Sequence, residues 1–342
     1  MGGRRRPGAR RAICFVCAAL SAGGAVAQET APFFAGKTIT IAVGSPPGGG
    51  YDIAARAVAH HFGKHVPGRP TVIVQNVPGA SSLALTNQLY AAGRRDGTII
   101  GVVINGMVTA PLLAPAEVRF NLADFIWIGN LSRDVQVVTA SAAAPAKTID
   151  DLFTTGLMVG GQTPGNSTVD IPLGMNGVLR TKFTVVRGYE SSGAVDLAIE
   201  RGEVHGNGAV GWVSVKSRNQ QWLREGKLRV LAQYGWKKHA DLPDVPLFPV
   251  PDAADDRQAL RVLWAGQDFG RPFLLPPGVP ADRVAILRDA FEKTVGDPDF
   301  RAEAAKLAVD IDPDSGETLQ QLARDILATS PAVAARLREM LK

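Results

Sequence analysis

A glycine-rich turn between an apolar run and a helical pattern is the feature that most constrains the fold of this chain. The run Thr38–Val43 is apolar and β-branched, the segment from Gly44 to Asp52 contains three consecutive glycines, and a helical pattern begins near Ile53. Glycine lets the backbone adopt positive φ and approach a ligand closely. The first amides of a helix lack intrahelical acceptors and have partial positive charge, so this turn predicts an anion site. A tight structural turn without a ligand is the alternative interpretation.

The N-terminus has the pattern of a secretory signal peptide. Five arginines lie within the first 11 residues, an apolar run from Ala12 to Leu20 follows, and the sequence Ala25-Val26-Ala27 precedes Gln28. A basic region, a short apolar region and an A-x-A site are typical of exported proteins. The apolar run is too short to span a bilayer. We therefore predict cleavage after Ala27, in a signal peptide of residues 1–27, and a soluble mature protein in the periplasm.

Cleavage at this position would change the composition of the chain in two ways. Both cysteines, Cys14 and Cys17, would leave with the signal peptide, which excludes disulfides, thiolate metal sites and cysteine nucleophiles. The chain has 37 basic and 32 acidic residues, and the leader holds five arginines and no acid, so the mature protein has no formal net charge. With this balance and few aromatic residues, we expect no nucleic acid partner.

Strand and helix patterns alternate along residues 28–342, which follow the leader. The predicted strands are residues 38–43, 71–75, 98–104, 126–131, 135–141, 157–160, 183–186, 228–233 and 273–275. The predicted helices are residues 53–65, 82–92, 149–153, 171–180, 192–201, 213–225, 281–295, 299–307 and 316–341. This alternation predicts an α/β protein with mainly parallel sheets flanked by helices. The length is natural for two domains.

Three further loops follow predicted strands in the same way as the first. A second glycine-rich loop runs from Gly161 to Asp170 and contains Gly165, Asn166, Ser167 and Thr168. Tyr189 lies in the loop after residues 183–186, and Asn105 follows residues 98–104. Ligands in open α/β sheets bind beyond the carboxyl ends of strands, so four such loops form a coherent site. Helix capping by Asn166 and ordinary packing of Tyr189 are the alternatives.

Motifs for catalysis are missing from the sequence. There is no GxxxxGK[ST], no GxGxxG after a strand and no GxSxG. His61 and His65 are four residues apart on a predicted helix and could bind a metal, but no nearby acid joins them in the sequence. We therefore expect no enzyme, no metal and no cofactor.

The loops and their order resemble the Bug-type receptors, which are periplasmic substrate-binding proteins of tripartite tricarboxylate transporters. The strongest segment is Pro46-Pro47-Gly48-Gly49-Gly50-Tyr51-Asp52 after its strand. Shorter matching segments are residues 74–80, 95–98, 188–189, 202–204, 226–231, 242–246 and 276–280. Together they cover essentially the whole mature chain.

The resemblance implies a two-lobed class II periplasmic binding fold. The chain would cross between the lobes near Asp134 and near residues 264–269. Residues 28–133 and 265–342 would form lobe 1, and residues 134–264 would form lobe 2. Family members typically hold a carboxylate with the first loop and the mid-chain loop. In this chain the resemblance implies the following ligand-binding residues: Ser45, Pro47, Gly48, Gly49, Asp52, Gly165, Asn166, Ser167, Thr168 and Tyr189. The position of Asn105 after a strand adds it to this set.

Two acidic residues in these loops need a separate interpretation. A carboxylate that faces an anion would repel it, so we expect Asp52 mainly to cap the helix and order the first loop. The mid-chain loop lacks the histidine that is common in the family and has Asp170 close by. Asp170 could pair with a cationic group such as a ligand amine, or it could cap its helix.

The resulting hypothesis is an extracytoplasmic solute receptor. It would bind a small carboxylate between two lobes and deliver it to the membrane components of a tripartite transporter. One alternative is a sensory receptor that signals to a membrane kinase, and another is a periplasmic enzyme that uses the same cleft. We expect a monomer, because the sequence contains no coiled coil and no intermolecular thiol.

Overall fold

The structure is a computed structural model that describes residues 1–3 and 32–342. The predicted signal peptide and its cleavage site lie almost entirely outside these residues. Pro32–Lys342 forms one compact unit that contains two β-sheets. Within the described part of the chain, no helix is both long enough and apolar enough to cross a membrane.

The first sheet has six strands in the order β11-β4-β10-β3-β1-β2. They are β1 (Thr38–Val43), β2 (Thr71–Asn76), β3 (Ile99–Val102), β4 (Ile126–Asn130), β10 (Pro272–Leu275) and β11 (Asp314–Ser315). β1 runs parallel to β2 and β3, and Val43 lies opposite both Asn76 and Val102. β10 runs antiparallel to β3 and β4, as β11 does to β4. The carboxyl ends of β1, β2 and β3 therefore meet at one edge.

The second sheet has five strands in the order β7-β6-β8-β5-β9. They are β5 (Gln136–Ser141), β6 (Leu157–Gly160), β7 (Phe183–Val186), β8 (Gly206–Gly211) and β9 (Leu228–Gln233). β6 is parallel to β7 and β8, whereas β5 is antiparallel to β8 and β9. Both sheets are thus mixed. The predicted α/β class is confirmed. The sheets were predicted to be mainly parallel, but both also contain antiparallel strand pairs.

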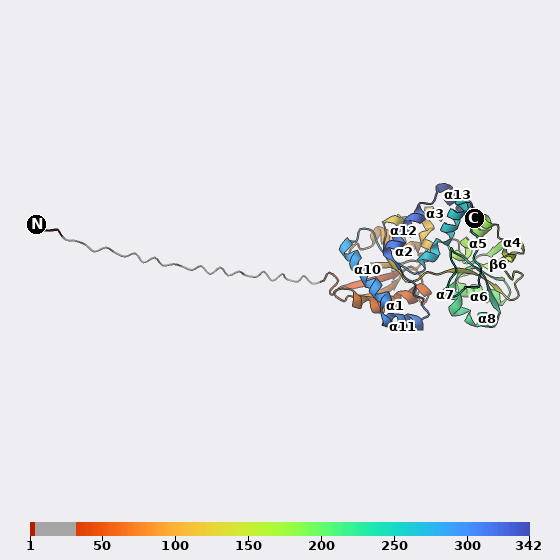
Figure 1. Cartoon of the computed structure of the whole chain (residues 1–342), viewed down its shortest axis with the longest axis horizontal. Helices are drawn as coiled ribbons and strands as arrows, with labels where there is room; N and C mark the ends of the chain where they lie inside the picture. The colour runs from red at the N-terminus through yellow and green to blue at the C-terminus, as the bar shows by residue number, and fades with distance from the viewer. Residues whose placement is uncertain (4–31) are drawn as a thin grey trace. The chain divides into compact units, whose positions relative to one another are not determined.

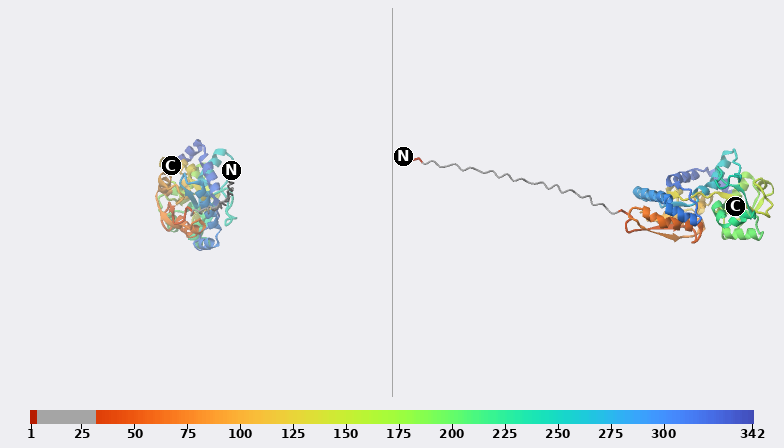
Figure 2. Two further views of the ribbon diagram at one scale, coloured as in Figure 1. Left: turned by 90° about the vertical axis from the view of Figure 1, so that its left-hand side faces the viewer. Right: turned by 60° about the horizontal axis from the view of Figure 1, so that its bottom comes forward.

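Helices cover both faces of the first sheet because its strands are apolar on both sides. Ile41 and Val43 contact one core and Ala42 contacts the other, as the alternation of a strand requires. In Figure 1, α2 and α12 lie on one side and α1 and α11 on the other, and Figure 2 shows orange α1 beside the blue C-terminal helices. These helices are α1 (Gly50–His65), α2 (Leu83–Ala92), α10 (Ala281–Gly296), α11 (Pro298–Lys306) and α12 (Gly316–Leu327).

The remaining helices pack mainly around the second sheet. They are α3 (Ala110–Leu113), α4 (Asp151–Thr154), α5 (Ser167–Leu179), α6 (Ser192–Glu200), α7 (Trp212–Arg218), α8 (Gln220–Arg224), α9 (Ala254–Trp264) and α13 (Pro331–Met340). The C-terminal helix α13 contacts α3, α5 and α9, and its Val333 and Leu337 belong to the core of the second sheet. The division of the chain into residues 28–133 with 265–342 and residues 134–264 stays a prediction.

Within residues 32–342, the chain passes between the two sheets twice. The first crossing links β4 to β5, and the second leads from β9 through α9 and the 3₁₀ turn η5 (Ala265–Phe269) to β10. Backbone hydrogen bonds join the crossings, from the Asp134 amide to the Gln267 carbonyl and from the Leu131 amide to the Arg271 carbonyl, each 3.0 Å long. The two segments therefore form a hydrogen-bonded connection and not two independent linkers.

Several predicted boundaries differ from the structure. The central strand β8 and helix α9 were not predicted. The helix predicted at residues 316–341 is interrupted before Pro331, which cannot continue a helix from the preceding residues, and the one at 213–225 is interrupted at Asn219. Helix α1 begins at Gly50 and α5 at Ser167, one turn earlier than predicted in each case. Both predicted loops are therefore shorter, and their last residues form the first turns of helices.

Candidate functional site

The first glycine-rich loop forms a tight turn that leads directly into α1. Gly48 has a φ of +80°, which favours glycine, and Gly49 is the N-cap of the helix. Pro47, Gly48 and Gly49 are all exposed, so their backbone is accessible. The first helical amides, from Gly50 onward, lack intrahelical acceptors by their position. The main-chain amides at which we predicted an anion site are therefore accessible at this turn.

Asp52 closes the first loop from beneath and is itself buried. Its Oδ2 accepts from the Gly48 amide at 2.8 Å and from Nε of Arg56 at 3.0 Å, and its Oδ1 accepts from Nδ2 of Asn76 at 2.9 Å. Burial by itself would raise the pKa of Asp52, but these hydrogen bonds outweigh it and hold the pKa below its usual value. The carboxylate orders the loop, as the sequence predicted, and its acceptors are already occupied.

Ser45 lies under the same loop. The residue is only 6% exposed, and within the described residues its hydroxyl has no hydrogen-bond partner, although its carbonyl accepts from Nδ2 of Asn76 at 3.0 Å. A buried hydroxyl without a partner is uncommon in a folded protein. Among the predicted residues of this loop, Ser45 therefore has a free polar side-chain group to offer a ligand or a water molecule.

Ser82 is a residue of this edge that the sequence analysis missed. Its hydroxyl donates to the Gly44 carbonyl at 3.0 Å and accepts from the Ile104 amide at 2.9 Å, so it joins the ends of β1 and β3. Ala80, Ser81 and Ser82 all have positive φ, which non-glycine residues rarely adopt. A run of three such residues stores strain beside the site. The preceding Gly79 was the available signal for an unusual turn.

The mid-chain loop uses most of its polar side chains internally. Oδ1 of Asn166 accepts from the amide of Thr168 at 3.0 Å and from its hydroxyl at 2.8 Å, while Nδ2 of Asn166 donates to Gln162 at 2.6 Å. The Thr168 hydroxyl also accepts from the Gln162 amide at 3.0 Å. Asn166 is therefore the N-cap of α5, which was the alternative interpretation from sequence. Ser167 and Gly165 remain as the accessible groups of this loop.

Asp170 lies in the first turn of α5 and orders the same loop. Its Oδ1 accepts from the Gly165 amide at 3.1 Å. Burial raises the pKa of Asp170 to about 6, although the Gly165 hydrogen bond and the charge of Arg187 partly oppose this increase. The side chain is therefore mainly ionised at neutral pH and largely protonated at pH 5.

Tyr189 packs beside the mid-chain loop but does not line the cavity described below. The Tyr189 amide donates to the Gly161 carbonyl at 3.2 Å, and the Gly188 amide donates to the Gln162 carbonyl at 2.9 Å, so two predicted loops are joined. The ring is half-buried against a small core that includes Val195. Its location fits both the ligand role and the packing role that were inferred from sequence.

One cavity brings predicted residues from both sheets together. Asn105, Gly165 and Ser167 line it, along with Asp170 and the two glutamines Gln136 and Gln267. Asn105 begins the 3₁₀ turn η2 (Asn105–Val108) after β3, whereas Ser167 begins α5 after β6. The loops approach so closely that a Cβ on Gly106 would lie 2.9 Å from the Gly165 carbonyl oxygen. The predicted residues between Ser45 and Asp52 are not among those that line this cavity.

Arg271 is a second residue that the sequence analysis missed. Its guanidinium lies 4.6 Å from the centre of the Tyr51 ring, and one of its nitrogens is 3.6 Å from Oδ2 of Asp134. A Cβ on Gly50 would meet another of its nitrogens at 3.2 Å. The Tyr51 hydroxyl in turn accepts from the Asn105 amide at 3.0 Å. The guanidinium of Arg271 and the carboxyl group of Asp134 therefore lie buried together directly behind the first glycine loop.

The sequence of this chain matches a known family of transport receptors. The sequence pattern of the tripartite tricarboxylate transporter family receptor matches residues 54–338 of this chain. The chain belongs to this family. A relative from Cupriavidus necator, described as a UPF0065 protein in the gbd 5′ region, is 26% identical over 98% of each chain. The resemblance inferred from the glycine loops is thereby confirmed.

Solved structures show the same fold at low sequence identity. A solute-binding protein of this family from Polaromonas, without ligand, has a TM-score of 0.67 at 22% identity over 89% of this chain and 98% of that one. MatC from Rhodopseudomonas palustris with bound malate has 0.64 at 20% identity over 90% and 99%. A third protein, from R. palustris with adipate, has 0.66 at 18% identity over 88% and 97%. The two-lobed α/β architecture of this receptor is therefore shared with known binding proteins.

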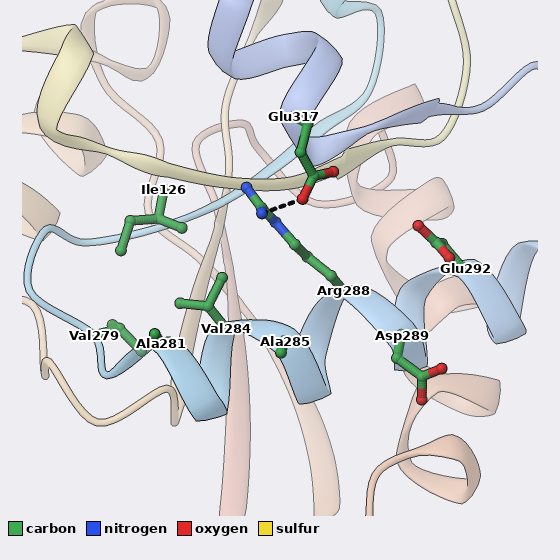
Figure 3. Close-up of a pocket in the computed structure, with 9 residues that line it drawn as sticks. All are labelled: Ile126, Val279, Ala281, Val284, Ala285, Arg288, Asp289, Glu292 and Glu317. Carbon is green, nitrogen blue, oxygen red and sulfur yellow. Dashed lines mark hydrogen bonds and ion pairs between the residues drawn. The ribbon is translucent and has the colours of Figure 1, made fainter.

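A larger hollow on the first sheet is a poor candidate for the anion site. This pocket has a volume of about 550 Å³ and is lined by residues of β4, of α10 and the loop before it, and of α12. Figure 3 shows that the side chain of Arg288 reaches across to Glu317. Asp289 and Glu292 also line the pocket, so carboxylates outnumber the one guanidinium and disfavour an anion. None of the predicted loop residues line this pocket.

The helix that was considered for a metal makes side-chain hydrogen bonds with its neighbour. His61 Nε2 is 2.7 Å from Glu303, and His65 Nε2 is 2.8 Å from Asp297. Both acids are distant in sequence and come from α11 or its N-cap, so the sequence did not reveal them. The residues 32–342 contain no group of three potential ligands that could hold a metal ion. These histidines join α1 to α11 through two separate carboxylates.

Proposed function

We propose that this receptor is exported and binds a small carboxylate between its two lobes for delivery to the membrane components of a tripartite transporter. The observation that best supports this is the cavity shared by Asn105 of one sheet and Ser167 of the other. A ligand held by loops of both sheets would favour the conformation in which these loops meet. The membrane partner would then recognise that closed state.

Carboxylates fit the groups at this edge better than other small solutes. The exposed backbone of Gly48 and Gly49 leads into the N-terminus of α1, which attracts negative charge. The related MatC structure contains malate and another neighbour contains adipate, and both ligands are dicarboxylates. We therefore infer that a small carboxylate is the ligand class, and that the cleft has no catalytic role.

A thermal-shift screen tests this proposal directly. The purified protein is unfolded and refolded to remove any bound ligand, then heated with mono-, di- and tricarboxylates, with amino acids and with phosphate. A ligand at 100 times its dissociation constant adds about 2.7 kcal/mol to the free energy of unfolding, so it raises the melting temperature clearly. A shift with phosphate alone, or with none of these compounds, contradicts the proposal.

Uptake measurements separate transport from the sensory alternative. Cells that lack this chain should lose uptake of the labelled ligand, even when the membrane components are expressed from a constitutive promoter. Normal uptake under these conditions, together with lost induction by the ligand, would show that the receptor signals and does not deliver.

A further inference from the structure

Two buried glutamines line the shared cavity, and in the side-chain amide of each one polar atom has no hydrogen-bond partner in the part of the chain that the structure describes. Gln136 is 3% exposed and Gln267 is 7% exposed. Oε1 of Gln267 accepts from the main-chain amide of Gln136 at 3.0 Å. Nε2 of the Gln136 side chain donates to the main-chain carbonyl of Asp134 at 3.3 Å. Within the described residues, this leaves Oε1 of Gln136 and Nε2 of Gln267 without a hydrogen-bond partner. One free acceptor and one free donor therefore belong to two residues that line the same cavity.

The cavity that these two residues line is small. The cavity has about 30 Å³ open to a water-sized group, which is room for one such group and not for a whole ligand. Buried polar groups in native proteins almost always have a partner, from protein or from ordered water. The pair is thus suited to a small group that both donates and accepts a hydrogen bond.

We propose that Gln136 and Gln267 form a subsite for a hydroxyl group of the ligand, so that this receptor prefers hydroxycarboxylates. A hydroxyl donates one hydrogen bond and accepts others, so it satisfies both glutamine groups at once. An ionised carboxylate has no donor for Oε1 of Gln136, and an ammonium has no acceptor for Nε2 of Gln267. A methylene group would leave both amide groups unpaired.

The location of the subsite places the hydroxyl beside the predicted carboxylate loops. Asn105, Gly165 and Ser167 line the same cavity as the two glutamines. Gln136 lies at the first crossing between the sheets and Gln267 at the second. The hydroxyl would therefore be bound at the junction of the two lobes while the carboxylate contacts the loops. This inference rests on the proposed function, because it specifies the ligand of the same site.

Calorimetric titration with matched ligand pairs tests the inference. Malate and succinate differ by one hydroxyl, as do lactate and propionate. We expect the receptor to bind the hydroxylated member of a pair at least tenfold more tightly, because a site built to pair a hydroxyl rejects an analogue without one. Gln136→Met removes the acceptor at similar volume. Gln267→Met removes the donor at similar volume without adding a charge that would repel every carboxylate.

Both variants should lower malate affinity at least tenfold and change succinate affinity much less. The control Gln321→Met makes the same type of substitution on exposed α12 and should leave the preference intact. Equal affinity of the unmodified receptor for both members of each pair overturns the inference and leaves the proposed function standing. Failure to bind any carboxylate overturns the proposed function instead. If both variants fold and still prefer the hydroxylated ligands, the hydroxyl subsite is not formed by the two glutamines. If a variant fails to fold, the titration of the unmodified receptor still decides whether hydroxycarboxylates are preferred.

Discussion

The main-chain amide of Gly48 donates a hydrogen bond of 2.8 Å to Oδ2 of Asp52, four residues further along the chain. This bond fixes the glycine loop against the first turn of α1, with Arg56 and Asn76 on the other sides of the carboxylate. An acidic residue in an anion-binding loop therefore has a structural role. It shapes the loop while its own charge is neutralised from behind.

We expect Asp52→Ala to lower the free energy of unfolding by roughly 2–3 kcal/mol, because hydrogen bonds to a buried charged group are lost. The pKa of Asp52 is lowered in the folded protein, so its stabilising contribution is present above its ordinary value of 3.8 and is lost as pH falls through the lower folded value. Urea denaturation at pH 7 and at pH 3 measures this difference. An equal effect at both pH values would contradict the assigned role.

Ser82→Ala should destabilise the protein by about 1–3 kcal/mol, because the Gly44 carbonyl and the Ile104 amide both lose their partner. The control Ser81→Gly changes the neighbouring residue, whose φ of +50° glycine adopts without strain, and should be neutral or slightly stabilising. Chemical denaturation of the two variants provides the comparison. If both variants lose the same stability, the loss in Ser82→Ala cannot be assigned to the Ser82 hydroxyl.

Asp170→Asn should stabilise the protein at pH 8, by roughly 1–3 kcal/mol, because burial raises the pKa of Asp170 from 3.8 to about 6. A raised folded pKa means that the carboxyl group contributes stability below 3.8 and loses it as pH rises through about 6. The advantage of asparagine should therefore shrink as pH falls from 8 to 4. Thermal melts across this range measure it, and an advantage that grows toward acidic pH would exclude this explanation.

Asp134→Leu should cost about 3–5 kcal/mol, because it leaves the buried guanidinium of Arg271 without its carboxylate partner. The double variant Asp134→Leu with Arg271→Met should recover much of this loss, since apolar residues need no partner. A double-mutant cycle by urea denaturation measures the coupling. Additive effects of the two single changes would show that the pair at the crossing is not coupled.

The sequence predicted elements best where local chemistry and tertiary packing favour the same structure. β1, β6, β7 and β9 begin and end at the predicted residues, because each is a short run of mainly apolar residues that suits a buried strand. α1 was recognised from its apolar spacing, and Ala54, Val58 and Phe62 are indeed buried one turn apart. The glycine loops followed from these elements.

The central strand β8 shows why other elements could not be predicted. Its sequence, Gly206-Asn207-Gly208-Ala209-Val210-Gly211, has the composition of a loop. Its glycines are required by neighbours that are distant in sequence: a Cβ on Gly206 would lie 1.9 Å from the Thr139 carbonyl oxygen, and one on Gly208 would lie 2.4 Å from Pro172. A single sequence does not reveal such contacts.

By itself, the sequence determined the α/β class, the family and the loops that follow the strands, because these depend on local patterns and on short motifs. Only the tertiary structure decided which polar groups of these loops already have partners and which do not. It showed that Asn166 and Asp52 are occupied by neighbouring groups, and it revealed Arg271 and the glutamine pair, Gln136 and Gln267. Those three side chains come from the two crossings between the sheets. Their proximity arises from long-range folding, which no local pattern encodes.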